Sequence, residues 1–433
     1  MENLLPSSYA LRQMFHTLLP SGIRMFGAGI QFLSTVIVAR VLGDGPSAGF
    51  FFWSSVLMTS GPIATYGLEQ IALRNVPRLQ RDGRNDEIGS FVAGLRSLSL
   101  LVSFLIGLGW VVYAVVTQPE PGGFRIWHLL APLALASIAT TLINGEALKG
   151  LSRPVAGTIY GHLLPVSLFC VLVALFAGYL SSPGILTLYT GSYLVGALAA
   201  RYAPGGNFRA HYFSWPGREK RGELIREGFS ICCVSLFGAL GFIVPLAIME
   251  MTRPAAEVSH LTTAFRIGIL FIVLGSAIHS VFAPALSRSA ELPNPFTPVF
   301  KVHGKAIVIT LAALGLPLGI GIAFPEPVML IFGEAFRGGA ESLRLLLIVQ
   351  LLSLCLGPVP YLLLMTGHTA FLARIGVAKF AAATILSFLL IPRFGGSGMV
   401  AAMGIAFLGE GLIGIAYAVI KLRAEKSGNK AEE

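Results

Sequence analysis

Residues 154–200 read PVAGTIYGHLLPVSLFCVLVALFAGYLSSPGILTLYTGSYLVGALAA, a run of 47 residues without Asp, Glu, Lys or Arg. A helix of about 20 apolar residues crosses the hydrocarbon core of a bilayer. The run is therefore long enough for two membrane spans joined by a turn at residues 179–184. Shorter uncharged runs recur along the chain, at 97–119, 228–249, 267–287, 306–325 and 345–373. This pattern predicts an all-α, multi-pass membrane protein.

The composition supports this prediction. Apolar residues make up 55% of the 433 residues and charged residues 12%, about half of the ~25% that is usual in soluble proteins. An ordinary soluble enzyme and a disordered chain are therefore excluded. The net charge of +10 does not indicate nucleic-acid binding, because the basic residues lie between the apolar runs. The four cysteines lie inside those runs, so we predict no disulfide framework. The residue spacings indicate no metal site and no cofactor.

We predict about twelve transmembrane helices when a few charged residues are allowed within spans. Their predicted positions are residues 15–41, 47–73, 88–116, 126–148, 155–178, 183–203, 228–250, 258–286, 304–324, 341–365, 370–391 and 396–420. The chain then divides into an N-terminal six-helix lobe (1–203), a cytoplasmic basic linker (204–227), a C-terminal six-helix lobe (228–421) and a charged cytoplasmic tail (422–433). Because each lobe has an even number of spans, we expect the lobes to share one orientation, as in transporters built from parallel repeats.

The basic residues predict the orientation of the chain. Of the 31 Lys and Arg residues, 22 lie in segments on the same side of the membrane as the N-terminus, and four lie in segments on the other side. Cytoplasmic loops are enriched in Lys and Arg. We therefore predict that both termini are cytoplasmic.

Two motifs near the N-terminus resemble a known transporter family. Residues 39–49 read ARVLGDGPSAG, and residues 67–78 read GLEQIALRNVPR. They resemble the first two helices of oligosaccharide flippases, the polysaccharide-transport branch of the multidrug/oligosaccharidyl-lipid/polysaccharide (MOP) superfamily. In that family the first helix ends in Ala-Arg-x-Leu-Gly, and the second ends in Gly-Leu followed by Arg and a basic loop. The matching residues are Ala39, Arg40, Leu42, Gly43, Gly49, Gly67, Leu68, Arg74 and Arg78, with further similarity at Glu257-Val258 and Ile331-Phe332-Gly333.

The resemblance implies a fold and a function. The fold is a two-lobed helical bundle around a central cavity that opens alternately to each side of the membrane. The function is movement of an undecaprenyl-pyrophosphate-linked oligosaccharide across the bacterial cytoplasmic (inner) membrane, for cell-surface or exopolysaccharide biosynthesis. The implied partners are the lipid-linked oligosaccharide, membrane lipids and other polysaccharide assembly proteins. Neither an enzyme activity nor a nucleotide-binding domain is implied, and the chain has no Gly-x-x-x-x-Gly-Lys-Ser/Thr loop.

Three arginines lie within predicted spans, namely Arg24, Arg96 and Arg266. A charge at the bilayer centre costs roughly 2.5–3.5 kcal/mol on insertion scales, so such residues usually face a wet cavity. Guanidinium groups pair with phosphate oxygens and stay charged at any relevant pH. We therefore predict that these arginines bind the pyrophosphate of the substrate. The alternative is a structural role, in which Arg24 and Arg96 extend to the inner surface or pair with acids.

Glu410 is the intramembrane acid of most interest. It lies between Gly409 and Gly411 and eleven residues before Lys421, which places it about 16 Å from the inner face by helical rise. A carboxyl group in an apolar environment can exchange a proton in the physiological range, which suits ion coupling. The alternative is a protonated carboxyl group bonded to a neighbouring helix. For the motif residues Arg40, Gly43 and Gly67 we expect structural roles, since an Arg near a helix C-terminus favours the helix dipole.

Three other functions remain open. A multidrug or cation antiporter of the same superfamily would need an acid in the first lobe, whereas the first predicted span offers Arg24 and no acid. A membrane-embedded glycosyltransferase or polysaccharide polymerase generally needs a sizeable outer loop, and the longest outer loops, 117–125 and 325–340, are short. A transporter-like protein could also assist an envelope pathway without moving substrate.

Overall fold

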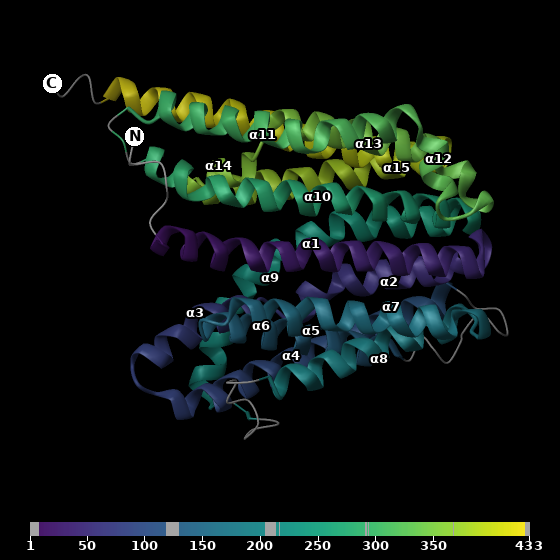
Figure 1. Cartoon of the computed structure of the whole chain (residues 1–433), viewed down its shortest axis with the longest axis horizontal. Helices are drawn as coiled ribbons and strands as arrows, with labels where there is room; N and C mark the ends of the chain where they lie inside the picture. The colour runs from purple at the N-terminus through teal and green to yellow at the C-terminus, as the bar shows by residue number, and fades with distance from the viewer. Residues whose placement is uncertain are drawn as a thin grey trace. The chain divides into compact units, whose positions relative to one another are not determined.

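A computed structural model of the chain is almost entirely helical over the residues that it describes, with no strand among them (Figure 1). The described residues are 8–117, 130–203, 214–215, 217–290, 292, 294–366 and 368–428. Within these ranges, nine helices are long and apolar enough to cross a membrane, and a tenth, α9, qualifies when its two parts are taken together. The chain is therefore a multi-pass membrane protein, as predicted.

Among the described residues, the first half of the chain contains eight α-helices and two shorter helical turns. They are α1 (Ser8–Leu42), α2 (Asp44–Ala64), α3 (Leu68–Arg81), α4 (Asn85–Thr117), α5 (Ala131–Gly150), α6 (Pro154–Thr158), the π-helical turn η2 (Ile159–Leu163), α7 (Leu164–Phe176), the 3₁₀ turn η3 (Ala177–Tyr179) and α8 (Ser182–Arg201). The second half is also helical. It contains α9 (Arg218–Thr252), α10 (Ala255–Ala290), α11 (Phe296–Ala323), α12 (Pro325–Leu330), the 3₁₀ turn η4 (Glu334–Gly339), α13 (Ala340–Leu356), α14 (Val359–Met365) and α15 (Thr369–Gly428).

The twelve predicted spans coincide with these helices apart from one or two residues at their ends, and residues 126–129 of span 126–148 lie outside the described residues. Span 47–73 is interrupted by the break between α2 and α3, span 155–178 by the π-helical turn, and span 341–365 by the break between α13 and α14. Span 228–250 lies on α9, whose two parts are bent by 48°. Helix α15 contains the last two spans, which are separated at Gly395, where the backbone has φ 56° and ψ −130°. The predicted break at Arg393, Gly395 and Gly396 is thus confirmed.

The chain forms two compact units. The N-terminal unit comprises Met1–Leu42 and Trp53–Ala239, and the C-terminal unit comprises Gly43–Phe52 and Leu240–Glu433. Each unit therefore contains a segment from the other half of the sequence, because the first turns of α2 pack with the C-terminal unit and the first part of α9 packs with the N-terminal unit. Helix α9 begins at Arg218, so the end of the predicted linker is helical. Residues 204–213 of that linker and 429–433 of the predicted tail lie outside the described residues.

The N-terminal unit is built around α5. This helix packs against α3, α4 and α8, while α1 packs against α7, and Figure 1 shows α4, α5 and α8 running alongside one another. Large aliphatic residues of α3, α4 and α5 form a buried core. They include Leu68, Ile71, Val76, Val92, Leu95, Ile143 and Leu148.

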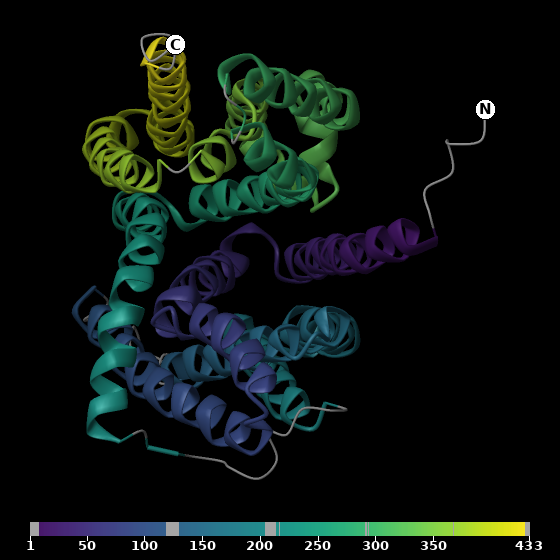
Figure 2. The same cartoon turned by 90° about the vertical axis from the view of Figure 1, so that its left-hand side faces the viewer.

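The C-terminal unit is built around α10, α11, α13 and α15. Helix α13 packs against α10, α11 and α15, and α14 packs against α10 and α15. Figure 2 shows the two halves of α15 as neighbouring olive and yellow helices, and a hydrogen bond joins them at Lys379 and Glu410. The two halves of this hairpin therefore bring together residues that are far apart in the sequence.

Two glycines of the family motifs adopt a left-handed backbone conformation. Gly43, which separates α1 from α2, and Gly67, which separates α2 from α3, both have φ +74°. Residues with a Cβ rarely adopt this conformation. A Cβ on Gly67 would also lie 2.6 Å from the Cβ of Ile231 in α9, whereas a Cβ on Gly43 would meet open space. Both motif positions are thus explained by backbone geometry, and Gly67 also by packing.

We expect Gly67→Ala to destabilise the protein more than Gly43→Ala. Each variant carries the left-handed strain of roughly 1–2 kcal/mol, and Gly67→Ala adds an overpacking penalty of roughly 1–3 kcal/mol. Thermal unfolding of the two purified variants beside the parent protein measures the difference. Equal losses of stability would mean that the contact with Ile231 is unimportant.

The break in α15 is held by two charged residues from the α9–α10 junction. Glu257 Oε1 accepts a hydrogen bond from the backbone N–H of Gly396 (2.8 Å), and Arg253 Nε donates to the carbonyl oxygen of Ile391 (3.2 Å). Arg253 and Glu257 also form an ion pair, with Nε 3.8 Å from Oε2. A carboxylate at the first N–H groups of a helix satisfies donors that have no partner within the helix and interacts favourably with its dipole. Glu257 thus caps the second half of α15.

Removing this cap should weaken the hairpin. We expect Glu257→Ala to lower the free energy of unfolding by roughly 1–3 kcal/mol, because the N–H of Gly396 loses a charged acceptor. Glu257→Gln keeps an acceptor oxygen and should lose less. The midpoint of thermal unfolding of the two variants is the measurement, and a larger loss for Gln than for Ala would contradict the capping role.

Candidate functional site

A cavity of about 290 Å³ lies within the C-terminal unit, between α10, α13, α14 and α15. Its wall is mostly apolar, and of the described residues that line it, Glu410 is the one that carries a charge. Its polar lining residues are Ser276, His279, Ser353, Tyr361 and Glu410. A second cavity of about 260 Å³ shares Phe271, Ser353 and Phe407 with the first and adds Gln350. Concave, mostly apolar sites with a few polar groups are typical of ligand-binding pockets.

Glu410 forms an ion pair with Lys379. Lys379 Nζ donates to Glu410 Oε2 at 2.8 Å, and the ammonium nitrogen also lies 4.5 Å from the centroid of the Phe407 ring. The Glu410 and Lys379 side chains are 14% and 19% exposed, so both charges are largely buried. Each charge offsets part of the desolvation cost of the other. Glu410 is therefore bonded to the other half of α15, and its role in ion coupling stays a prediction.

Arg24 lies in a cationic region of the N-terminal unit. Its side chain is exposed on α1, and it is close enough to interact electrostatically with Lys149 of α5 and His162 of η2. Lys149 Nζ donates to Glu146 Oε1 at 2.5 Å. Arg24, Lys149 and Glu146 together carry one net positive charge. This region can attract an anion, and the exposed Arg24 guanidinium is its accessible group.

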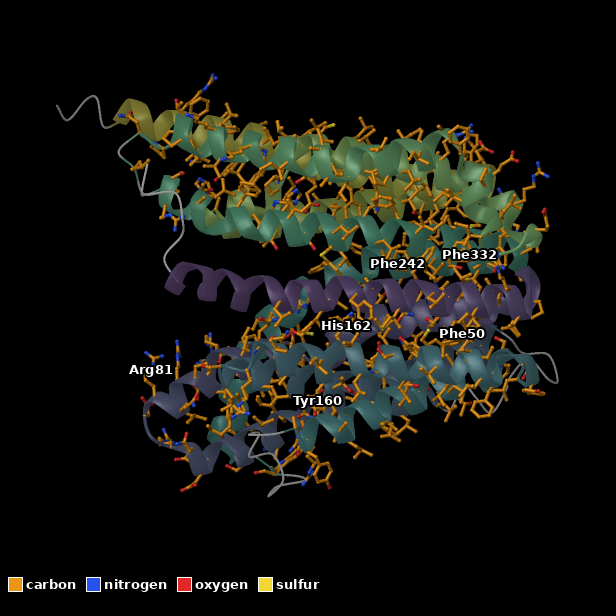
Figure 3. The ribbon with its side chains drawn as sticks, viewed as in Figure 1. Phe50, Arg81, Tyr160, His162, Phe242 and Phe332 are labelled. Carbon is orange, nitrogen blue, oxygen red and sulfur yellow. The ribbon has the colours of Figure 1, made fainter. Side chains whose placement is uncertain are left out.

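The π-helical turn η2 places His162 beside α1. A Cβ on Gly27 of α1 would lie 3.3 Å from the His162 ring, so the two helices are in contact there, and Figure 3 shows His162 next to α1. Single π-helical turns within α-helices occur often at functional sites. This turn therefore brings an imidazole into the region of Arg24.

Arg266 of α10 is half-buried in the C-terminal unit and stacks on two aromatic rings. Its guanidinium carbon lies 4.9 Å from the centroid of Phe51 and 5.9 Å from that of Phe50, both in the first turns of α2. The Phe51 ring also packs against Phe336 of η4, with centroids 6.4 Å apart. Arg266 thus has a packing role within its unit.

The other predicted arginines have different surroundings. Arg96 is 4% exposed within the N-terminal unit and lies in the field of Arg201, which is also 4% exposed. Arg40 is exposed in the last turn of α1, where the helix dipole favours a cation. Arg24 and Arg96 therefore occupy separate electrostatic environments within the same unit, and substrate binding by the predicted arginines stays a prediction.

Comparisons with solved structures reveal the same architecture elsewhere. An inward-facing multidrug resistance MATE-family transporter of the MOP superfamily aligns with a TM-score of 0.69 and 15% identity, over 95% of this chain and 99% of its own. The lipid II flippase MurJ in an inward closed conformation aligns with a TM-score of 0.71 and 13% identity, over 94% and 87%. A MOP-superfamily transporter from Pyrococcus furiosus, described as having a binding pocket of reverse polarity, aligns with a TM-score of 0.61 and 15% identity, over 95% and 96%.

The chain has the fold of MOP-superfamily transporters. The suspected fold and its two lobes are thereby confirmed, over nearly the whole length of the chain. No protein-family model and no curated protein sequence matches the chain. At these identities the comparisons establish the fold, and the ligand has to be argued from the residues of this chain.

Some features of this MOP-fold chain were not predicted from its sequence. The partner of Glu410 is Lys379, 31 residues away on the other half of the hairpin. The sequence did contain a signal for this pair. Lys379 and Glu410 interrupt two adjacent predicted spans, and buried charges are usually paired. The electrostatic interaction of Arg24 with His162 of η2 had no comparable signal in the sequence. Among the described residues there is no group of three or more His, Cys, Asp and Glu residues that could hold a metal ion.

Proposed function

We propose that the chain is a flippase that moves a lipid-pyrophosphate-linked oligosaccharide across the bacterial cytoplasmic membrane by alternating access. The observation that supports this most is the exposed Arg24, in a region of net positive charge on the first helix of a MOP fold. A pyrophosphate is an anion that a guanidinium group binds with two parallel hydrogen bonds. The solved structures that share this fold include a lipid II flippase. The motifs around Arg40 and Gly67 resemble those of oligosaccharide flippases.

In this proposal the substrate-binding cations are Arg24, Arg266 and Arg96. Arg24 would capture the pyrophosphate from the cytoplasmic side, and Arg266 would hold it as the transporter reopens to the outside. Arg96 is the deepest of the three, so its contribution would be electrostatic unless the N-terminal unit opens. Assembly proteins of the same polysaccharide pathway would deliver and collect the substrate, with the linker at 204–227 and the tail at 422–433 in the cytoplasm.

A second candidate function is multidrug or cation antiport. It is favoured by the likeness to MATE-family transporters and by a buried acid, Glu410, at a mostly apolar cavity. However, Glu410 is already paired with Lys379, which leaves less negative charge for a cationic drug. An antiporter should confer resistance to organic cations, and a flippase should not.

The cellular test of the proposal is glycan export in a strain that lacks the gene. The surface glycan should disappear and its lipid-linked precursor should accumulate at the inner leaflet, and both should be restored by the parent chain. Normal export without the gene, combined with sensitivity to organic cations, would favour the antiporter.

The orientation is tested with reporter fusions. A reporter after Glu433 should be cytoplasmic, and one within residues 117–123 should be outside, because the basic segments are predicted to be cytoplasmic. Alkaline phosphatase activity at each site, with a fluorescent-protein fusion as its complement, is the measurement. A cytoplasmic signal from residues 117–123 would contradict the twelve-span arrangement.

A further inference from the structure

The ion pair in the C-terminal unit includes Glu410, which lines the cavity of that unit. Glu410 is the charged group of the 290 Å³ cavity among the residues that the structure describes, so a cation entering it would seek this carboxylate. Lys379 Nζ already occupies a position 2.8 Å from Oε2. Two like charges at one carboxylate repel strongly where water is scarce.

The ammonium group of Lys379 is fixed in this place by more than the carboxylate. It lies 4.5 Å from the Phe407 ring centroid, and a cation over an aromatic face is attracted by the ring quadrupole. Both side chains of the ion pair are largely buried, which limits screening by water. Lys379 therefore behaves as a cation tethered to the site.

We propose that Lys379 excludes sodium from Glu410, and thereby from the cavity of the C-terminal unit. A hard cation such as sodium needs several oxygen ligands, and Lys379 occupies part of the coordination space of the carboxylate.

Other titratable groups near Glu410 define the background of the measurement. His279 of α10 and Tyr361 of α14 line the same cavity. His303 of α11 lies behind the wall, where its Nε2 is hydrogen-bonded to the carbonyl oxygen of Leu356 of α13 (3.0 Å). None of these groups is a carboxylate, so sodium binding that depends on Glu410 can be separated from their titration.

Removing the tethered cation should create a sodium site. In Lys379→Met the carboxylate loses its counter-ion, while the hydroxyl groups of Ser276 and Ser353 line the same cavity and could supply further oxygen ligands. We expect this variant to bind sodium about tenfold or more tighter than the parent, which is within the range of typical coupling free energies between two sites. The double variant Lys379→Met/Glu410→Gln should lose this binding again.

The test is sodium binding by the purified full-length protein. Retention of radioactive sodium and the midpoint of thermal unfolding are measured in sodium chloride and in choline chloride at equal ionic strength. The parent chain and Glu410→Gln should behave alike in the two salts, and Lys379→Met should be stabilised by sodium. Sodium binding by the parent chain that disappears in Glu410→Gln would overturn the inference, as would folded Lys379→Met that gains none.

Two controls keep the result decisive. If Lys379→Met does not fold, Lys379→Gln removes the charge with a polar side chain, and the comparison of the parent chain with Glu410→Gln is independent of either variant. The readout is also independent of transport. Failure of the proposed flippase function would be seen in glycan export and would leave these sodium measurements unchanged.

Discussion

Arg24→Ala should reduce glycan export about ten- to a hundredfold. A charge-assisted contact with phosphate contributes roughly 1.5–3 kcal/mol, and the exposed Arg24 guanidinium is free of the packing constraints that hold buried side chains. Arg24→Lys keeps the charge and loses the two-pronged geometry, so it should retain part of the activity. Arg40→Ala is the matched control, because it removes an exposed arginine from the same helix, and it should leave export near normal. Surface glycan in complemented cells is the measurement, with the amount of protein in the membrane determined alongside.

Arg266→Ala should reduce export by a similar factor, with an additional loss of stability. Its guanidinium group lies over Phe51 at 4.9 Å, and such stacking contributes roughly 0.5–2 kcal/mol. Thermal unfolding of the purified variant separates the two effects, because Arg24→Ala should unfold like the parent chain. Full export by both alanine variants at normal membrane levels would mean that these arginines are structural and that the pyrophosphate site lies elsewhere.

Glu410→Gln should both destabilise the C-terminal unit and abolish transport driven by a proton gradient. The substitution leaves the Lys379 ammonium buried without its carboxylate, and breaking a buried ion pair in this way costs roughly 3–5 kcal/mol. The double variant Lys379→Met/Glu410→Gln removes the unpaired charge and should recover most of the lost stability. Gradient-dependent transport should stay absent in both, because neither has a group at this position that can exchange a proton.

The double variant separates stability from coupling. Unfolding midpoints give the interaction energy of the pair by a double-mutant cycle, and export with and without a collapsed proton gradient gives the coupling. If Glu410→Gln unfolds like the parent chain, the ion pair is unimportant for stability. Transport that responds normally to the gradient in the double variant would exclude Glu410 as the coupling group.

The sequence predicted the positions of the helices well, because the exclusion of charge from the bilayer is a local property of composition. It also predicted the break between the last two spans, where Arg393 is followed by two glycines. It did not predict that span 47–73 is two helices, since an uncharged run conceals the break at Tyr66 and Gly67, where both residues have positive φ. The π-helical turn at Ile159–Leu163 was missed for the same reason.

The surroundings of the candidate site residues were harder to predict. We selected Arg24, Arg266 and Glu410 because a charged residue within a membrane span is costly and therefore suggests a function. A single sequence does not show which residues such a charge contacts. The pairing of Lys379 with Glu410 depends on how the hairpin of α15 folds back on itself. The position of Phe50 and Phe51 over Arg266 depends on the first turns of α2 packing with the C-terminal unit. Both arrangements are long-range contacts, which the local periodicity of the chain does not encode.

Translocation by the purified protein in liposomes tests the proposed function most directly. Vesicles are loaded in the inner leaflet with an undecaprenyl-pyrophosphate-linked oligosaccharide, and an enzyme added outside cleaves the sugars that reach the outer leaflet. The account predicts cleavage that depends on the protein, that falls sharply with Arg24→Ala and that survives Arg40→Ala. Cleavage no faster than in empty vesicles, from protein that exchanges organic cations for protons in the same preparation, would contradict it.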